Sequence, residues 1–558
     1  MTLAIQIVVL VVLAIYAKAG AVALKRPISD FYAGGGAIPG VLNGMAIAAS
    51  FIAVLTFASL AGGLAEDLEG RTAVLIGSTV GFVLIAFLLA PYLRKFGGYT
   101  VPDFLGERFG GTGVRPLAVI AVLLCSFPAL ALAVLGIAIL AERIFGIDAA
   151  TGLAVSGAMI LLCTIVGGMR SATFSQAAQY AVLLISSLAA LALLLWKQGT
   201  WLPDPGLVDA VVGRFKRETF TAADPVNRFA LGFCLAAGVA SLPHLLMRSF
   251  VSRSVAEART SFLLGLPFVA VLCIAAPAYL PLFSHAPINP SDVGAVSWFV
   301  SIAIGGISAC LALASGLALA IANALSYDVY FKGIDLTAPT ARRLFVARAA
   351  ILLVAGLAAA AAMARPGMLV TMAGAAFSLA ASAFLPALLL GIWWKRATGE
   401  GALAGMLAGL AVCLYYMFAP RYFPFAFYET SSFLSNATQD QAANYATLRQ
   451  SYYLADPGTR DAILANWEQT ARAVANWWGV ARAFAALFAV PVGFLVTIGV
   501  SLFTTAPSRD VQSFVEELRR PARLDPIVQG RGRCRQIAIG FLRRAGGTSR
   551  GSAPRHRR

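Results

Sequence analysis

The 558-residue chain is poor in charge. Only 12% of its residues are Asp, Glu, Lys or Arg, whereas 59% are hydrophobic, and soluble proteins carry about twice that charged fraction. Its seven cysteines are scattered, without a CxxC pair or a cluster of cysteine with histidine. This spacing excludes a disulfide framework and a zinc site. A glycine-rich phosphate loop and an acidic metal-binding motif are also missing. These absences argue against an enzyme and for an integral membrane protein.

Apolar runs of about 20 residues recur along the chain, and this is the length that a helix needs to cross a bilayer. Strands of a membrane barrel would be about 10 residues long with alternating character. The sequence therefore predicts an all-α, polytopic membrane protein. Thirteen spans are expected, at residues 3–24, 38–63, 72–93, 116–141, 148–168, 175–196, 229–251, 260–284, 295–326, 344–364, 368–394, 401–419 and 480–504. The first span lacks a basic stretch ahead of it, which favours a retained helix over a cleaved signal.

The net charge of +17 is unevenly placed. Twelve arginines and one acid lie between Arg519 and the C-terminus, so this tail contributes +11 and the rest of the chain +6. Basic residues also gather in alternate short connections between spans, as they do in cytoplasmic loops. We expect a bacterial inner or plasma membrane location, with the N-terminus outside and the C-terminus cytoplasmic. Membrane lipid is the expected partner, anionic lipid is a candidate contact of the tail, and no nucleic acid is expected.

The stretch at 43–63, NGMAIAASFIAVLTFASLAGG, is rich in small residues and hydroxyls. Small residues let helices approach closely, and hydroxyls can satisfy backbone groups that are freed where a membrane helix is interrupted. Tight helix packing alone would explain this composition. A binding site at an interrupted helix is the alternative.

Two segments, DFYAGGG at 30–36 and NGMAIAA at 43–49, resemble the solute:sodium symporter family, and within it the acetate permease branch of cation/acetate symporters. Further matches follow in the family's order: GGM at 167–169, Gln176, LPHLLMR at 242–248, SYDVY at 326–330 and FSLAASAFLPALLLGIWWKRATGEGALAG at 377–405. Together they cover roughly residues 30 to 410.

The resemblance implies a leucine-transporter-type core of two inverted five-helix repeats. The chain then divides into an N-terminal extra helix with the first cytoplasmic loop (1–37), a first repeat (38–196), a second repeat (229–394), two peripheral helices (401–505) with an extracellular loop (420–479), and a basic cytoplasmic tail (506–558). In such folds the first helix of each repeat is broken near the midplane. The candidate breaks are Ala48-Ala49-Ser50 in the first, and Ala236-Ala237-Gly238 followed by Pro243 in the second.

The function implied by the resemblance is secondary active transport. A small monocarboxylate such as acetate would be taken up together with Na⁺ or H⁺ by alternating access, without an enzymatic cofactor. Two alternatives stay open: symport of another small solute such as an amino acid, and a transporter-like sensor with a separate signalling partner. The expected substrate-binding residues are small or carry a polar group: Ala49, Ser50, Thr56, Gly238, Ser241 and His244.

Three ionisable residues are singled out as candidates. His244 is either a neutral imidazole bonded to a neighbouring helix or a proton-linked group. Arg248 lies four residues on, on the same helical face, and is an anchor near the cytoplasmic end or a gate that attracts anions. Asp328 is expected to pair with Arg342 or Arg343, and a part in ion release is the alternative.

A cation site is implied at the first and eighth core helices, where sodium-coupled relatives use backbone carbonyls and two adjacent hydroxyl side chains. By spacing, the carbonyl positions fall on Ala48 and Phe51, and the hydroxyl positions on Ala312 and Leu313, which have no hydroxyl. Ser315 could substitute only with a shift of register. The sequence leaves Na⁺ and H⁺ both open, along with a cation held by other oxygens and no coupling ion. No other metal is expected.

Overall fold

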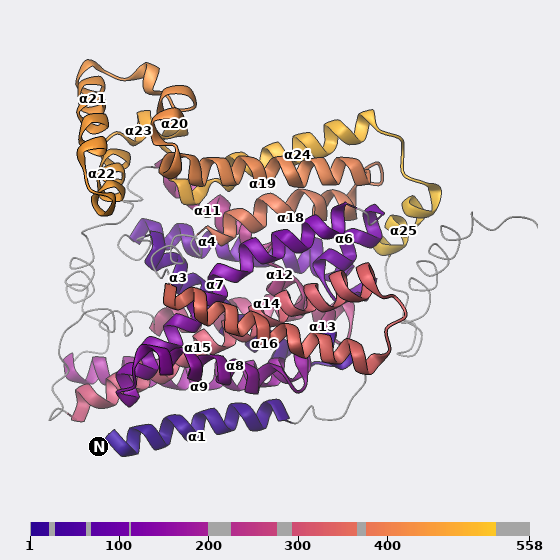
Figure 1. Cartoon of the computed structure of the whole chain (residues 1–558). Coiled ribbons are helices and arrows are strands. Elements are labelled where there is room, and N and C mark those ends of the chain that lie inside the picture. The colour runs from indigo at the N-terminus through magenta and orange to yellow at the C-terminus, as the bar shows by residue number, and fades with distance from the viewer. Residues whose placement is uncertain are drawn as a thin grey trace, which may run out of the picture.

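The computed structural model describes residues 2–21, 28–62, 68–110, 113–198, 225–275, 293–364 and 375–520. Within these ranges every regular element is a helix (Figure 1). The helices of the bundle are α1 (Thr2–Ala21), α2 (Ile28–Ala33), α3 (Gly40–Gly62), α4 (Leu68–Leu84), α5 (Ala90–Phe96), α6 (Val101–Phe109), α7 (Val114–Phe145), α8 (Ala149–Thr164), α9 (Gly168–Gln198), α11 (Pro225–Val239), α12 (Pro243–Leu246), α13 (Arg248–Val251), α14 (Val255–Ala275), α15 (Val293–Asn323), α16 (Thr340–Ala364), α18 (Ala376–Trp393), α19 (Gly399–Tyr422) and α24 (Ala486–Phe503).

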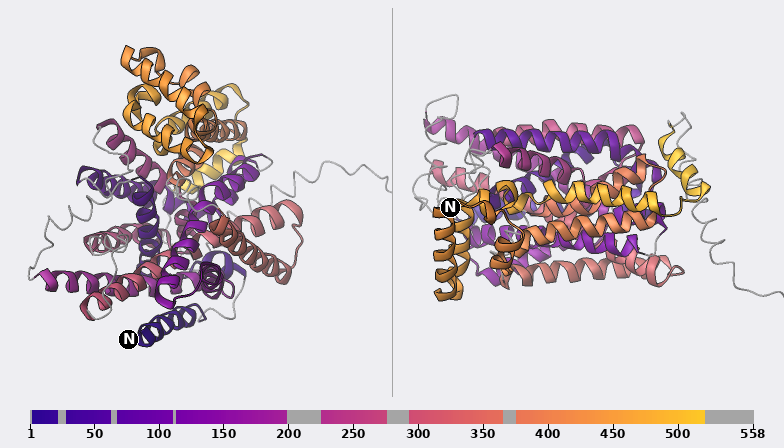
Figure 2. Two further views of the ribbon diagram at one scale, coloured as in Figure 1. Left: turned by 60° about the vertical axis from the view of Figure 1, so that its left-hand side comes forward. Right: turned by 90° about the horizontal axis from the view of Figure 1, so that it is seen from above.

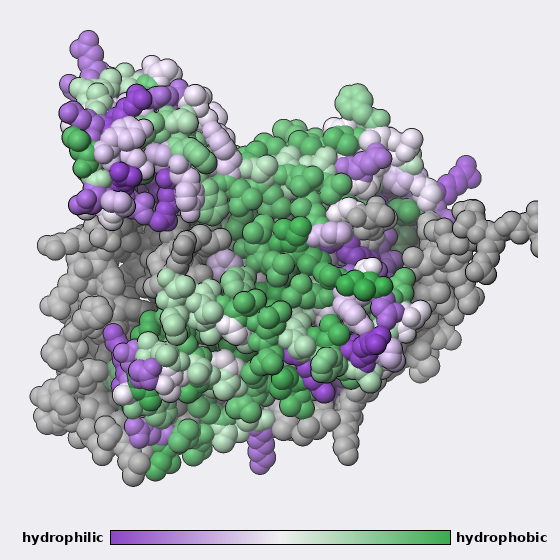
Figure 3. Space-filling model, viewed as in Figure 1, coloured by the Kyte–Doolittle hydropathy of each residue, from purple (hydrophilic) through white to green (hydrophobic). Residues whose placement is uncertain are grey.

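Nine helices in the described ranges are long and apolar enough to cross a bilayer, and the bent pair Pro225–Val239 and Pro243–Val251 makes a tenth. Three shorter apolar helices occupy the remaining expected spans: Leu10–Gly20, Gly40–Ala53 and Ala149–Thr164. Each of the thirteen predicted segments thus contains an apolar helix. Hydrophobic residues cover the middle of the visible face, and hydrophilic residues gather toward its two ends (Figure 3). This is the surface of a multi-pass membrane protein.

The two ends of the bundle carry different additions. Helices α20 (Pro424–Thr430), α21 (Gln439–Leu454), α22 (Pro457–Thr470) and α23 (Arg472–Ala475) stand at the end where α1 begins, and α25 (Arg509–Arg519) lies at the opposite end (Figures 1 and 2). This agrees with the expectation that the N-terminus and the 420–479 segment share one side. Which side faces the cytoplasm stays a prediction. The basic tail beyond residue 520 lies outside the described residues.

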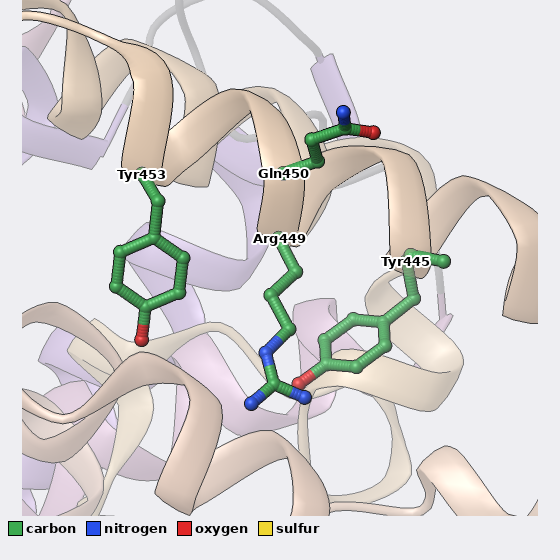
Figure 4. Close-up of a pocket in the computed structure, with 5 residues that line it drawn as sticks. Tyr445, Arg449, Gln450 and Tyr453 are labelled. Carbon is green, nitrogen blue, oxygen red and sulfur yellow. The ribbon is translucent and has the colours of Figure 1, made fainter.

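The segment made of α20 to α23 is held together by aromatic and ionic contacts. On the surface of α21, Arg449 and the hydroxyl of Tyr445 lie beside each other (Figure 4), and both bond to the carboxylate of Glu429, at 3.1 and 3.0 Å. A pocket at this place is lined by Tyr445, Ala446, Arg449, Gln450 and Tyr453. Because this helix stands at the end of the bundle, the pocket lies away from the interrupted membrane helix described next.

Only one of the two predicted helix breaks is present. Helix α11 ends at Val239, α12 begins at Pro243, and the two parts are bent by 43°. This confirms a break in the second repeat ahead of Pro243, which cannot donate a backbone hydrogen bond, whereas Ala236, Ala237 and Gly238 still belong to α11. The break predicted at Ala48-Ala49-Ser50 is wrong, since α3 continues through it. No glycine or proline lies between residues 45 and 53, so nothing in this stretch interrupts the helical hydrogen bonds.

The start of α3 is tied to the end of α13. The backbone N–H of Ile38 donates to the carbonyl of Val251 at 3.3 Å, within an isolated bridge between Ile38 and Ser252. The side chain of Asn43 donates to the carbonyl of Arg248 at 3.0 Å and to the hydroxyl of Ser252 at 3.2 Å. The first helices of the two expected repeats are therefore joined directly, next to the helix break.

Candidate functional site

Arg248 begins α13, directly after the interrupted part of the chain. Its side chain is buried, with 1% of the residue exposed. The guanidinium donates from Nη1 to the hydroxyl of Thr173 at 2.7 Å and from Nη2 to Oε1 of Gln176, both on α9. Among the described residues no carboxylate lies within ion-pair distance of it. The interpretation of Arg248 as an anchor that reaches the cytoplasmic surface is therefore wrong, because the segment after the bend directs it toward α9.

Gln176 connects Arg248 to α15. Its Nε2 donates to the carbonyl of Ala312 at 2.7 Å and lies 3.4 Å from the hydroxyl of Ser315. A carboxamide has one accepting oxygen and one donating nitrogen. The guanidinium can only donate and the carbonyl can only accept, so this is the orientation of the amide that satisfies both neighbours.

His244 lies on α12, one helical turn before Arg248. It is 3% exposed, and among the described residues neither ring nitrogen has a hydrogen-bond partner. The alternative of an imidazole bonded to a neighbouring helix is therefore wrong. A Cβ built on Gly316 would lie 4.0 Å from Cδ2 of His244 and 3.3 Å from Nε2 of Gln176. The ring and the amide thus meet at the same glycine of α15. A buried polar group without a partner is costly, so His244 indicates a place for a ligand.

The other predicted substrate-binding residues are not open to a ligand in the same way. Ala49 and Ser50 are buried, and the hydroxyl of Ser50 donates to the carbonyl of Ala46 at 2.8 Å, within its own helix. Ser241 likewise donates to the carbonyl of Ala237 at 2.7 Å. The side chain of Thr56 lies outside the described residues.

Gly238 lies where α11 and α18 pack closely together. A Cβ on it would meet Cβ of Phe377 on α18 at 2.6 Å. The glycine therefore gives room to a neighbouring helix, and its part in substrate binding stays a prediction.

The predicted cation positions lie on α3 and α15, which pack together. Ala48 and Phe51 are buried within the continuous part of α3. On α15 the Ala312 carbonyl accepts from Gln176, Leu313 is an apolar side chain, and the hydroxyl of Ser315 donates to the carbonyl of Leu311 at 2.6 Å. Their part in cation binding stays a prediction.

Asp328 belongs to a second polar cluster, in the π-helical stretch η4 (Ala324–Ile334) that follows α15. It accepts a hydrogen bond from Thr100 at 2.6 Å and lies 3.5 Å from Arg115 of α7. The predicted partners are wrong: Arg342 pairs with Asp335, and Arg343 stacks on the ring of Phe331. The reason is burial, since Asp328 is 2% exposed and turned toward α6 and α7.

Two acids of α6 extend this cluster. Arg115 also lies 3.5 Å from Asp103 and 3.1 Å from Glu107, and Lys332 lies 2.8 Å from Glu107. Burial alone would raise the pKa of Glu107, but the charges and hydrogen bonds of Lys332 and Arg115 outweigh it and lower the pKa below its usual value. Burial raises the pKa of Asp103.

Sequence reasoning missed Thr173 and Asn43 and gave Gln176 no role. The available signal was their polarity: Thr173 and Gln176 are three residues apart in a membrane helix, and therefore share a face.

Comparison with known proteins places the chain in a family. It matches the model of the Sodium:solute symporter family over residues 31–304 and 292–409. It is 31% identical to an uncharacterized symporter of Cupriavidus necator, over 73% of this chain and 84% of that protein. It is 26% identical to the uncharacterized symporter YwcA of Bacillus subtilis, over 69% and 80%.

Among solved structures, a substrate-bound, outward-open Na⁺-coupled sialic acid symporter matches with a TM-score of 0.64 and 16% identity, over 90% of this chain and 98% of that one. This likeness confirms the predicted leucine-transporter-type helical fold. The helical membrane architecture, the family model and the relatives agree that this protein is a membrane transporter, which carries a small solute together with a cation, and that it is not an enzyme. We conclude that the chain belongs to the sodium:solute symporter family.

Proposed function

We propose that this protein imports a small monocarboxylate such as acetate across a bacterial inner membrane by alternating access, with its N-terminus outside and its C-terminus in the cytoplasm. The observation that carries this proposal is the guanidinium of Arg248, which is buried beside the helix break with only neutral partners in the described part of the chain. The unpartnered imidazole of His244 lies one turn away.

A carboxylate fits this arrangement by charge. Removing a cation from water is costly unless an anion or several acceptors replace the water. The guanidinium has five N–H donors, and among the described residues two of them have acceptors. Carboxylates bind this planar fork in a bidentate manner. His244, on the same helical face, can add a donor or acceptor to the bound solute.

The same charges favour a monocarboxylate over the alternative of an amino acid. An amino acid brings an ammonium group, which needs a carboxylate or several acceptors. In the described structure no Asp or Glu bonds to Arg248, His244 or Gln176. A dicarboxylate would bring a second negative charge to a single cation. A small, otherwise apolar solute with one carboxylate therefore matches the single positive charge of Arg248 best.

The test is uptake of radiolabelled acetate into proteoliposomes under an imposed Na⁺ gradient, an imposed pH gradient, or neither. Protein-free liposomes are needed as a control, because neutral acetic acid crosses bilayers unaided. We expect saturable, protein-dependent uptake that propionate inhibits and alanine does not. Arg248→Met should reduce it at least tenfold, whereas Gly356→Ala, at an open position of α16, should not. Inhibition by alanine alone, or no protein-dependent uptake, would reject a monocarboxylate.

Uptake by the same vesicles under the two gradients identifies the coupling ion. Uptake driven by the pH gradient and lost in His244→Ala would assign H⁺ as the cation. Concentrative uptake that requires the Na⁺ gradient would assign Na⁺.

A further inference from the structure

We propose that this transporter carries its own positive charge beside the place where the family resemblance puts the coupling cation. In this proposal the amide of Gln176 hydrogen-bonds to the oxygen atoms of Ala312 and Ser315 on α15, and the guanidinium of Arg248 supplies the charge. Solute binding then does not require Na⁺ at this place. The inference rests on the proposed function only for the choice of acetate as the test anion.

The oxygens that a cation would need are already engaged. A hard cation takes several oxygen ligands. The carbonyls of Ala48 and Phe51 lie inside the continuous helix α3, where each carbonyl accepts the N–H four residues on. The carbonyl of Ala312 accepts from Gln176 at 2.7 Å, and the hydroxyl of Ser315 donates to the carbonyl of Leu311 at 2.6 Å. Leu313 has no oxygen in its side chain.

A positive charge is also already present. Arg248 donates to Oε1 of Gln176, whose Nε2 donates to the carbonyl of Ala312. The guanidinium is thus only two hydrogen bonds away from the predicted cation ligand, and no carboxylate lies between them in the described chain. Like charges repel strongly at such separations in a medium of low dielectric constant. Na⁺ would have to displace the amide and then stand beside an uncompensated arginine.

These contacts also supply the cross-link between helices that a bound ion would give. The side chain of Asn43 on α3 donates to the carbonyl of Arg248 on α13 at 3.0 Å. From Arg248 the connection continues through Gln176 on α9 to Ala312 on α15. Four helices around the break are therefore bridged by protein groups alone.

The experiment compares Na⁺ with choline at equal ionic strength, which removes differences in charge screening, on the purified full-length protein. The first readout is thermal unfolding without solute, and the second is binding of radiolabelled acetate. A Na⁺-coupled symporter of the same family, measured in parallel, shows that the assays respond to Na⁺. We expect the unfolding temperature and the acetate affinity of this protein to be the same in both salts, the affinity within twofold.

A rise in unfolding temperature specific to Na⁺, or acetate binding at least tenfold tighter in Na⁺, would overturn the inference. Failure of acetate to bind in either salt would reject the proposed solute instead, and the unfolding measurement would still decide the question of Na⁺. A charge variant gives a further check. If the arginine is the counter-charge, Arg248→Met should lose acetate binding in both salts. Full acetate binding by Arg248→Met in choline would contradict it.

Discussion

Thr100 donates a hydrogen bond to the carboxylate of Asp328 at 2.6 Å, across 228 positions of sequence. This bond joins the start of α6 to the π-helical end of the α15 span. Arg115 lies against the same carboxylate and against two further acids, Asp103 and Glu107. One arginine therefore balances three carboxylates, with the help of Lys332.

Arg115→Met should destabilise the protein more than Asp328→Asn. Without the arginine, three carboxylates face one lysine, and breaking a buried ion pair from one side costs about 3–5 kcal/mol. Asn at position 328 still accepts the bond from Thr100, so we expect a loss of about 1–3 kcal/mol. Thermal unfolding in detergent measures the order. Arg342→Ala is the control, since its ion pair with Asp335 is exposed and should contribute about 0–1 kcal/mol. The reverse order of the two buried variants would contradict this account of the cluster.

Glu107 gives the cluster a dependence on pH. Its pKa is below the ordinary value of 4.5, because Lys332 and Arg115 outweigh the effect of burial. A carboxyl with a lowered folded-state pKa stabilises the fold above its unfolded pKa, and this contribution is lost as the pH falls through the folded value. The difference in unfolding temperature between wild type and Glu107→Gln should therefore be largest near neutral pH and shrink below pH 4.5. A difference that grows in acid would show that the group is not held as a carboxylate.

Gly238→Ala tests close packing at the helix break. The added methyl group would meet Cβ of Phe377 at 2.6 Å and its Cα at 2.8 Å, which requires α11 and α18 to separate. We expect a loss of about 1–3 kcal/mol and reduced uptake. Gly356→Ala on α16 is the matched control, because nothing lies within 4 Å of its added Cβ, and this change should be neutral or stabilise by up to about 1 kcal/mol. Equal unfolding temperatures for the two variants would show that the contact at Gly238 is relaxed.

Helix α25 should stabilise the end of the bundle to which it binds. Val515 and Leu518 are buried, Phe514 packs edge-on against Phe96 of α5 at 6.2 Å, and Lys395 of the α18–α19 connection pairs with Glu516. Leu518→Ala should cost about 2–3 kcal/mol, seen as a lower unfolding temperature.

Removal of residues 531–558, which include no residue of the predicted site, should leave uptake intact. Loss of transport by that truncation at normal membrane levels would assign the basic tail a function.

The span pattern and the family could be predicted from the sequence, because length and apolarity fix the thirteen segments and the motifs keep the family's order. The break near Pro243 was also predictable, since proline removes a backbone donor. The continuity of α3 was not, because small residues permit both close packing and interruption. Nor could the sequence reveal that Arg248 faces Gln176, since the direction of a side chain after a break depends on the angle of the bend.

The partner of Asp328 escaped prediction for a related reason. Arg115 lies in a short connection between the predicted spans 72–93 and 116–141, where a basic residue indicates only membrane orientation. The contact between Arg115 and Asp328 arises because α6 packs back against α7. No local pattern in the sequence predicts this packing.

The backbone bond between Ile38 and Val251, together with the bond from Asn43 to Arg248, joins the start of α3 to α13, so we expect the two to move together. Spin labels on the exposed neighbours Ala37 and Ser254 should then report one narrow distance, whatever solute or ion is added. That pair would serve as an internal ruler. Motions of other helices could be measured against it, and the elements that alternate in transport could be separated from those that stay fixed.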